Sequence, residues 1–299
     1  MKTIKINENA KQLFGADKLQ YSKTSFSAYK RVIETDRKNA PLLVLQSPLG
    51  KNPFITNALN QIFFHICDDE KQAKEVASKV AAHLFTSKMP LRELELSTCE
   101  MVTAAIPGYG AKIQQKLSSR SSTIFTQLAP FIDGETVLDV GAGNGKVAEK
   151  ISKELGKNVF LVDVMDYNTT SLPLHIFDGT KMPAAIPNSD TSIVSVVFHH
   201  ADSPIELLEE VIRVTNKRIV VIESVYFNEQ HRELNVILDW LYNRVFNDGI
   251  NCPFNFQTPA GWVSTFKKYG LKIAASKDLG IDQPLVPEYH WLFALDVGK

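Results

Sequence analysis

A buried-strand pattern that breaks into alternating glycines decides the fold: residues 137–145 read Val-Leu-Asp-Val-Gly-Ala-Gly-Asn-Gly, and a helical pattern follows at residues 146–155. Glycines let the backbone approach a ligand closely because they carry no side chain. The first turn of the following helix offers unpaired amide groups and the positive end of the helix dipole. The stretch therefore predicts a turn that binds a nucleotide-like ligand.

The spacing of these glycines argues against a dinucleotide. A dinucleotide-binding turn has the pattern Gly-x-Gly-x-x-Gly, whereas the third glycine here, Gly145, comes one residue early. Asp139 lies two residues ahead of Gly141; it would repel a pyrophosphate but suits a ligand that carries a cation. An oxidoreductase with a nicotinamide cofactor stays as an alternative that affinity for NAD would reveal.

The glycine spacing and Asp139 resemble motif I of the class I S-adenosylmethionine-dependent methyltransferases. In that family this loop receives the methionine end of the cofactor, which carries an ammonium and a carboxylate and no phosphate. The resemblance covers residues 136–295 and implies an α/β fold, with a Rossmann-like, mostly parallel seven-stranded sheet and an antiparallel C-terminal edge. It also implies S-adenosylmethionine as cofactor, with these loop residues in contact with it: Asp139, Gly141, Ala142, Gly143, Asn144 and Gly145.

Strand patterns alternate with helical ones from Thr136 onward, which indicates crossover units and a mostly parallel sheet. Residues 159–164, 193–198 and 219–222 are mostly apolar, as strands buried on both faces are. The segments 271–275 and 291–295 are expected to pair as the antiparallel edge. Ligands of such sheets bind beyond the carboxyl ends of the strands.

Acidic residues follow the second and third expected strands. Asp163, next to Val164, can accept two hydrogen bonds from a ribose diol, and the family places an acidic residue here for that purpose. Asp166 is a nearby second candidate. Asp178-Gly179 stands where the family contacts the adenine amino group. The alternatives are a solvated turn aspartate at Asp163 and an ordinary Asp-Gly turn at Asp178.

The stretch after the fourth strand carries a second resemblance. Residues 198–204 read Phe-His-His-Ala-Asp-Ser-Pro, and together with Asp178-Gly179 and Glu223 they resemble small-molecule methyltransferases of ubiquinone and menaquinone biosynthesis. The stretch differs from the Asn/Asp-Pro-Pro-aromatic motif of enzymes that methylate planar amino groups. The resemblance implies a small-molecule acceptor, with a peptide as the alternative, and places Phe198 at the cofactor.

Methyl transfer from a sulfonium is an in-line displacement, so alignment of the acceptor and exclusion of water matter most. A hydroxyl or carbon acceptor also needs a base, and the available groups are His200, His199, Glu223 and His231. Consecutive residues that leave a strand point in divergent directions, so at most one of the adjacent histidines is expected to face the reaction. The alternative is that a histidine packs against the cofactor or caps a helix.

A helical insertion at residues 228–247 follows the fifth strand. Its apolar stripe is opposed by a polar stripe at four-residue and three-residue steps. We expect the polar stripe to contact the substrate, and the alternative is a solvated outer face. The expected substrate residues are Tyr226, Asn235, Asp239 and Tyr242.

No metal is expected. The three cysteines, Cys67, Cys99 and Cys252, lie far apart, give no zinc-ligand spacing, and are expected to be buried thiols in a reducing compartment. Two imidazoles with a carboxylate suit a divalent ion, so a metal-assisted reaction stays as an alternative. Its ligands would be His199 or His200 with His231, Glu223 or His290.

The charge balance, the hydropathy and the N-terminal sequence limit the kinds of partner to expect. Lys plus Arg and Asp plus Glu both count 33, so the basic surplus of a nucleic-acid clamp is absent. No apolar run approaches the roughly 20 residues of a membrane-spanning helix, and the N-terminus lacks a signal-peptide core. We therefore expect a cytoplasmic protein that binds neither nucleic acid nor membrane.

Two domains are expected, with a boundary near residue 110. Residues 1–110 are predicted to be mainly helical and to shape acceptor choice or mediate a homodimer, and residues 111–299 to form the methyltransferase domain. In the first region, residues 70–88 carry one apolar stripe, with Asp68 or Asp69 placed to cap the helix. A non-catalytic scaffold that binds the cofactor and a partner is the alternative, because a fold does not imply a function.

Overall fold

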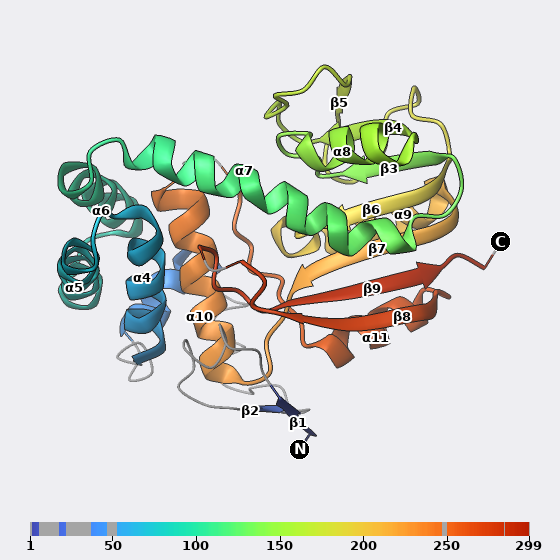
Figure 1. Ribbon diagram of the computed structural model, residues 1–299. Helices are drawn as coiled ribbons and strands as arrows, with labels where there is room; N and C mark the ends of the chain where they lie inside the picture. The colour runs from blue at the N-terminus through green and yellow to red at the C-terminus, as the bar shows by residue number, and fades with distance from the viewer. Residues whose placement is uncertain are drawn as a thin grey trace. The chain divides into compact units, whose positions relative to one another are not determined.

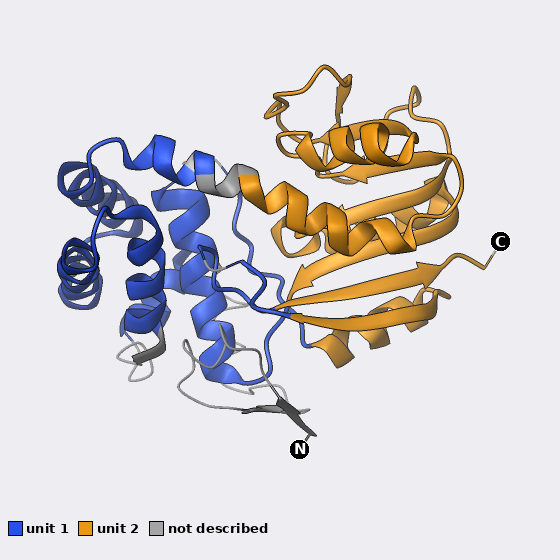
Figure 2. Ribbon diagram, in the orientation of Figure 1, with its two compact units in different colours: residues 1–117, 225–258, 280–289 blue, residues 118–224, 259–279, 290–299 orange. Residues whose placement is uncertain are grey.

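The computed structural model describes residues 2–5, 18–21, 37–46, 53–246, 250–283 and 285–298. The chain divides into two compact units, which Figure 2 colours separately. Unit 1 comprises residues 1–117, 225–258 and 280–289, and unit 2 comprises residues 118–224, 259–279 and 290–299. This division differs from the expected boundary near residue 110, because the helical insertion falls in unit 1. The expected two-domain assignment stays a prediction.

Unit 2 is built on a seven-stranded sheet with the order β5-β4-β3-β6-β7-β9-β8 (Figure 1). The neighbouring pairs from β5 to β7 are parallel, and β9 runs antiparallel to β7. The expected Rossmann-like, mostly parallel sheet with an antiparallel C-terminal edge is thus confirmed. The strands are β3 (Thr136–Val140), β4 (Asn158–Asp163), β5 (Leu174–Ile176), β6 (Ser189–Ser195), β7 (Thr215–Ser224), β8 (Lys272–Gly280) and β9 (His290–Asp296).

The strand order reverses beside β3. The chain runs outward from β3 through β4 to β5, and then returns to place β6 on the other side of β3. Val140, the last residue of β3, pairs with Val162 of β4 and Val194 of β6, so the carboxyl ends of the three strands share one edge. In open α/β sheets, ligands bind at such a reversal, outside the carboxyl ends.

The helices of unit 2 cover the sheet with apolar side chains. Helix α8 (Lys146–Leu155) buries Ala148 and Ile151, and it ends at Gly156, whose φ of 66° is left-handed. The other helical elements are α7 (Tyr109–Leu128), which begins in unit 1, and η2 (Ala129–Phe131), η3 (Phe198–His200), α9 (Pro204–Val214) and α11 (Pro259–Lys268). One core cluster joins α7, α8 and the strands: Leu128, Val137, Ala148, Ile151, Val159, Leu161, Ile193, Val220, Ile222 and Leu292.

Unit 1 is mainly helical in its described part. Asp69 caps α5 by accepting a hydrogen bond from the Gln72 amide, which confirms one of the two expected caps. The apolar stripe of α5, from Ala73 to Leu84, is buried as expected. The elements of unit 1 are β1 (Lys2–Lys5), β2 (Lys18–Tyr21), η1 (Arg37–Asn39), α3 (Ala40–Gln46), α4 (Pro53–Ile66), α5 (Glu70–Thr86), α6 (Leu91–Ala105), α10 (Glu229–Trp240) and η4 (Leu241–Val245).

Two sequence-based expectations differ from the structure. The cysteines are partly exposed, so the prediction that Cys67, Cys99 and Cys252 are buried thiols is wrong. β1 and β2 form an antiparallel pair in the region expected to be mainly helical.

Within the described residues, no helix combines the length and the apolar character that crossing a membrane requires.

Candidate functional site

The glycine loop after β3 is fastened to the end of β4. The amides of Gly141 and Ala142 both donate to the carbonyl of Val162, at 2.9 and 3.1 Å. The next amide, that of Gly143, donates to Oδ2 of Asp163 at 2.8 Å. The loop that carries the expected cofactor residues is thereby held against the strand that carries the expected ribose carboxylate.

Packing accounts for two of the three glycines. Gly141, Gly143 and Gly145 all have left-handed φ angles, of 69°, 53° and 73°. A Cβ on Gly141 would lie 2.5 Å from Cγ2 of Val197, and one on Gly145 would lie 2.5 Å from Oδ1 of Asn168. A Cβ on Gly143 would meet no protein atom within 4 Å. The space beside Gly143 is therefore open, as a loop that a ligand approaches closely requires.

Two carboxylates lie at the ends of β3 and β4. Asp139 is 4% exposed, and its Oδ2 has no hydrogen-bond partner among the described residues. Burial, and secondly the charge of Asp163, raises the pKa of Asp139 to about 7. Asp163 accepts hydrogen bonds on both oxygens, from the amides of Gly143 and Met165. The orphaned oxygen of Asp139 suits a donor, above all a cationic one.

Asp178 closes a turn. Its Oδ1 accepts hydrogen bonds from the amides of Thr180 and Lys181, at 2.8 and 2.7 Å, and from the Thr180 hydroxyl at 2.9 Å. These bonds hold the pKa of Asp178 below its ordinary value. Gly179 follows with a φ of 86°. The geometry agrees with the alternative of an Asp-Gly turn, and contact with a cofactor stays a prediction.

Large apolar side chains are exposed beside these carboxylates. Val164, Met165 and Ile176 are 53%, 46% and 52% exposed, directly after β4 and at the end of β5. A Cβ on Gly179 would lie 3.4 Å from Cγ1 of Val164, so the two loops meet. Such a surface suits a planar ring. Sequence reasoning missed Met165 and Ile176, although apolar residues where a strand ends in a polar turn were a usable signal.

The turn after β6 is organised by Glu223, the penultimate residue of β7. Glu223 is fully buried, and its Oε1 accepts hydrogen bonds from the amides of Val197 and Phe198, at 3.1 and 2.7 Å. Its Oε2 lies 2.7 Å from Nδ1 of His199. All three partners belong to unit 2. Glu223, which was expected as a base, therefore has its carboxylate hydrogen-bonded to the segment that carries His199, another expected base.

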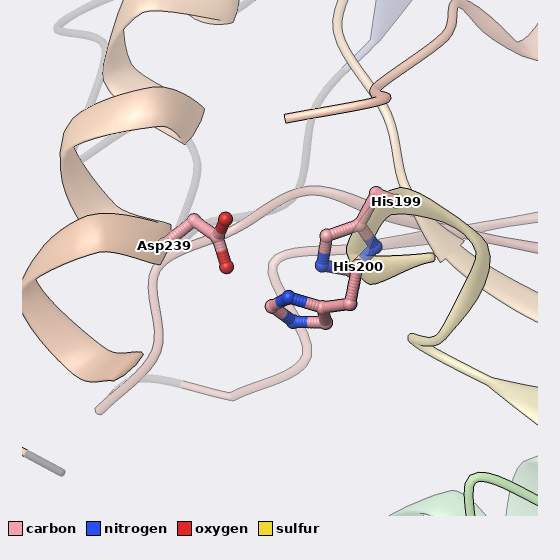
Figure 3. Close-up of side chains that lie close together, drawn as sticks. All are labelled: His199, His200 and Asp239. Carbon is pink, nitrogen blue, oxygen red and sulfur yellow. The ribbon is translucent and has the colours of Figure 1, made fainter. Parts of the chain in front are cut away.

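The adjacent histidines do not diverge. The rings of His199 and His200 lie with their centroids 4.1 Å apart and their planes at 42° (Figure 3). The expected divergence is wrong because the pair lies in the 3-10 turn η3 and not in an extended strand. A nitrogen of each ring lies within 4.8 Å of the other. Two such imidazoles can bind a divalent ion, and the absence of a metal stays a prediction.

The ring of Phe198 lies in the core of unit 2. It is fully buried and packs on Trp262 of α11, with ring centroids 5.7 Å apart. The burial of this side chain does not support its expected contact with a cofactor. His290, at the start of β9, is also buried.

In unit 1, the polar stripe of α10 is buried. Every residue from His231 to Trp240 is buried, so the alternative of a solvated outer face is wrong. The Asn235 amide group donates to the carbonyl of Val225 at 3.1 Å, and Asp239 (Figure 3) accepts from the Asn243 amide group at 2.7 Å. The other two expected substrate residues, Tyr226 and Tyr242, are also buried. Buried polar groups of this kind need defined partners.

His231 is poorly suited to act as a base. It is 1% exposed and lies against the rings of Phe227 and Tyr289, at 5.6 and 6.0 Å between centroids. Burial lowers the pKa of His231 to about 3, although the charge of Glu288 opposes the shift. A general base works best with a pKa near the operating pH. The sequence showed the residue type but not the desolvation.

Comparison with known proteins gives one family match and several fold matches. A family model described as a methyltransferase domain matches residues 109–276, more than half of the 299 residues. A SAM dependent methyltransferase from Aquifex aeolicus is 17% identical, with 59% of this chain and 89% of that chain covered and a TM-score of 0.43.

Two further solved structures are similar to this chain. The magnesium protoporphyrin IX methyltransferase from Synechocystis PCC 6803, with bound SAM, is 12% identical, with 62% of this chain and 81% of that chain covered and a TM-score of 0.42. The geranyl diphosphate C-methyltransferase from Streptomyces coelicolor A3(2) is 14% identical, with coverage of 63% and 84% and a TM-score of 0.47. No curated protein sequence matches the chain.

Proposed function

Because the chain belongs to the methyltransferase-domain family and its cofactor is S-adenosylmethionine, we propose that it methylates a small-molecule acceptor by in-line displacement. In this reaction the bond between the methyl carbon and sulfur breaks as a bond to the acceptor atom forms. S-adenosylhomocysteine leaves, and a proton of the acceptor passes to a base. The observation that carries the proposal is the glycine loop, which is fastened to Asp163 while the space at Gly143 stays open.

We assign each part of the cofactor to different residues of unit 2. We assign the ammonium of the methionine end to Asp139, whose buried Oδ2 has no partner in the described part of the chain. We assign the ribose diol to Asp163, because each of its oxygens keeps a second lone pair beyond the amide that it holds. The adenine is assigned to the exposed apolar side chains Val164, Met165 and Ile176, with Asp178-Gly179 beside them.

The acceptor is proposed to be small and polar. This part of the proposal is supported by the resemblance of residues 198–204 to small-molecule methyltransferases and by the buried polar side chains of α10. We assign acceptor contact to Tyr226, Asn235, Asp239 and Tyr242. The base is assigned to the histidine pair of η3, since His231 is desolvated and neutral.

Binding of S-adenosylhomocysteine tests the cofactor assignment. The compound is expected to raise the melting temperature and to give a calorimetric dissociation constant, whereas NAD is expected to do neither. A protein that binds NAD and not S-adenosylhomocysteine would be an oxidoreductase, contrary to the proposal.

Transfer of label tests the reaction. Incubation with S-adenosylmethionine labelled in its methyl group and a small-molecule cell extract is expected to yield labelled compounds of low mass. Label in an added peptide fraction alone would overturn the small-molecule assignment. Binding of cofactor with no transfer to either fraction would indicate a scaffold.

A further inference from the structure

We propose that Glu223 is a positioning residue that fixes His199 in the tautomer of a general base, with the lone pair on Nε2. The inference rests on the methyl transfer proposed above and adds which histidine accepts the proton and what orients it. Glu223 itself touches neither cofactor nor acceptor in this scheme. It acts through the imidazole, because all three hydrogen bonds of its carboxylate go to residues 197–199.

The hydrogen bond between Glu223 and His199 determines the tautomer. Oε2 of Glu223 lies 2.7 Å from Nδ1 of His199, and a carboxylate offers only acceptor atoms. The hydrogen between them therefore belongs to the imidazole, and Nδ1 is the donor. In a neutral imidazole with hydrogen on Nδ1, the lone pair is on Nε2. That nitrogen is the one that can receive the proton of an acceptor.

The burial of the pair explains why a carboxylate is needed. His199 is 1% exposed and Glu223 is fully buried. A base that gains a proton in such a place becomes a buried cation, which is costly without an opposite charge in contact. Glu223 supplies that charge at the moment of proton transfer. The carboxylate does not receive the proton, which stays on Nε2 until solvent removes it after the product leaves.

Backbone strain supports a functional purpose for this turn. Val196 has a φ of 62°, which is unusual and strained for a β-branched residue. Its amide donates to the carbonyl of Ile222 at 2.7 Å, and the next two amides donate to Glu223. Strain of this kind persists where the surroundings enforce it, and it concentrates at functional sites. Here the end of β7 enforces the turn that presents His199.

The deciding experiment replaces Glu223 with Gln and reads the tautomer directly. In the wild-type protein, nitrogen NMR of the imidazoles is expected to show His199 with hydrogen on Nδ1, assigned by its disappearance in His199→Asn. In Glu223→Gln, the amide oxygen can still accept from the backbone, so the amide nitrogen must donate to Nδ1. The His199 hydrogen is then expected to move to Nε2.

Methyl transfer gives the second readout. Transfer of label to the small-molecule extract is expected to fall about 100-fold to 10,000-fold in Glu223→Gln, with S-adenosylhomocysteine affinity within about twofold of wild type, as expected when a base is lost and cofactor contacts remain. The matched control is Asp190→Asn. Asp190 also accepts two backbone amides, from Glu135 and Thr136, and it pairs with Lys217 but with no imidazole. The control is expected to lose stability and to keep the His199 tautomer and the transfer rate.

The outcomes separate the two proposals. Hydrogen on Nε2 of His199 in the wild-type protein would overturn the role of Glu223 without any variant having to fold. So would a Glu223→Gln protein that keeps its transfer rate, or one whose loss equals that of Asp190→Asn. A wild-type protein that neither binds S-adenosylhomocysteine nor transfers label would instead refute the methyltransferase proposal, whatever the tautomer.

Discussion

Two strands of unit 2 carry buried carboxylates near their ends, and the two carboxylates differ in their hydrogen-bond partners. At the end of β7, Glu223 is surrounded by donors: two amides and one imidazole. Near the end of β3, Asp139 is equally enclosed, yet its Oδ2 has no partner among the described residues. A buried charge is tolerable when it is hydrogen-bonded and costly when it is not. The first carboxylate therefore has its hydrogen-bonding capacity used within the protein, and the second is the one that we propose for a ligand.

The two strand ends meet at one side chain. Val197 donates its amide to Glu223, and its Cγ2 occupies the space where a Cβ of Gly141 would lie. The glycine loop is thus shaped by the turn that Glu223 holds. Substitutions at this contact, at either carboxylate and at Asp178 test the difference between the two strand ends.

The largest effect is expected from Gly141→Ala. Its Cβ would lie 2.5 Å from Val197 and would need a left-handed φ of 69°. The strain and the overlap together are expected to lower the free energy of unfolding by about 2–5 kcal/mol, measured by denaturant titration. Gly143→Ala is the control, because its Cβ meets no protein atom within 4 Å and only the φ of 53° opposes it. Equal losses in the two variants would show that Val197 does not shape the loop.

Asp139→Asn is expected to weaken cofactor binding. The variant removes the charge that we assign to the ammonium, and one charge-assisted hydrogen bond corresponds to roughly 10-fold to 100-fold in the S-adenosylhomocysteine dissociation constant. Calorimetry at pH 8 measures the change. Glu223→Gln is the contrasting variant, with a lower free energy of unfolding and little change in affinity. Loss of affinity in Glu223→Gln, together with loss of stability alone in Asp139→Asn, would contradict the roles given to these two carboxylates.

The pH dependence of unfolding without cofactor tests the orphaned carboxyl. Burial raises the folded pKa of Asp139 to about 7, from an ordinary value of 3.8. Between these values the unfolded chain releases the proton while the folded protein keeps it, so stability is lost as the pH rises. The difference between wild type and Asp139→Asn is expected to change by up to about 1.4 kcal/mol per pH unit in this window. A flat difference would mean that Asp139 is solvated.

The smallest effect is expected from Asp178→Ala. The side chain is exposed and closes its own turn through Thr180 and Lys181, so its removal is expected to lower the free energy of unfolding only slightly. If adenine lies mainly on the apolar side chains, S-adenosylhomocysteine affinity should fall by less than about threefold, roughly 0.6 kcal/mol. A loss as large as that of Asp139→Asn would place Asp178 among the principal cofactor contacts.

Sequence reasoning identified the features that a local pattern of residues carries. The glycines, the two carboxylates after neighbouring strands and the mostly parallel sheet follow from pattern and spacing, because parallel strands bring their carboxyl ends to one edge. The sequence did not show which side chains are buried. The polar stripe of α10 is buried, which excludes the alternative of a solvated outer face, and a partner of Glu223 lies 24 positions away, at His199.

The sequence by itself determined the fold class and the family, and it predicted the loop that we assign to the cofactor, since alternating glycines between a strand and a helix leave few backbone conformations open. Only the tertiary structure decided what each ionisable side chain does. Asp139, Glu223 and His231 are all buried. Oδ2 of Asp139 has no hydrogen-bond partner in the part of the chain that the structure describes, Glu223 accepts three hydrogen bonds, and His231 is neutral among aromatic rings. Desolvation and hydrogen-bond partners depend on residues far apart in the chain, so no local pattern contains them.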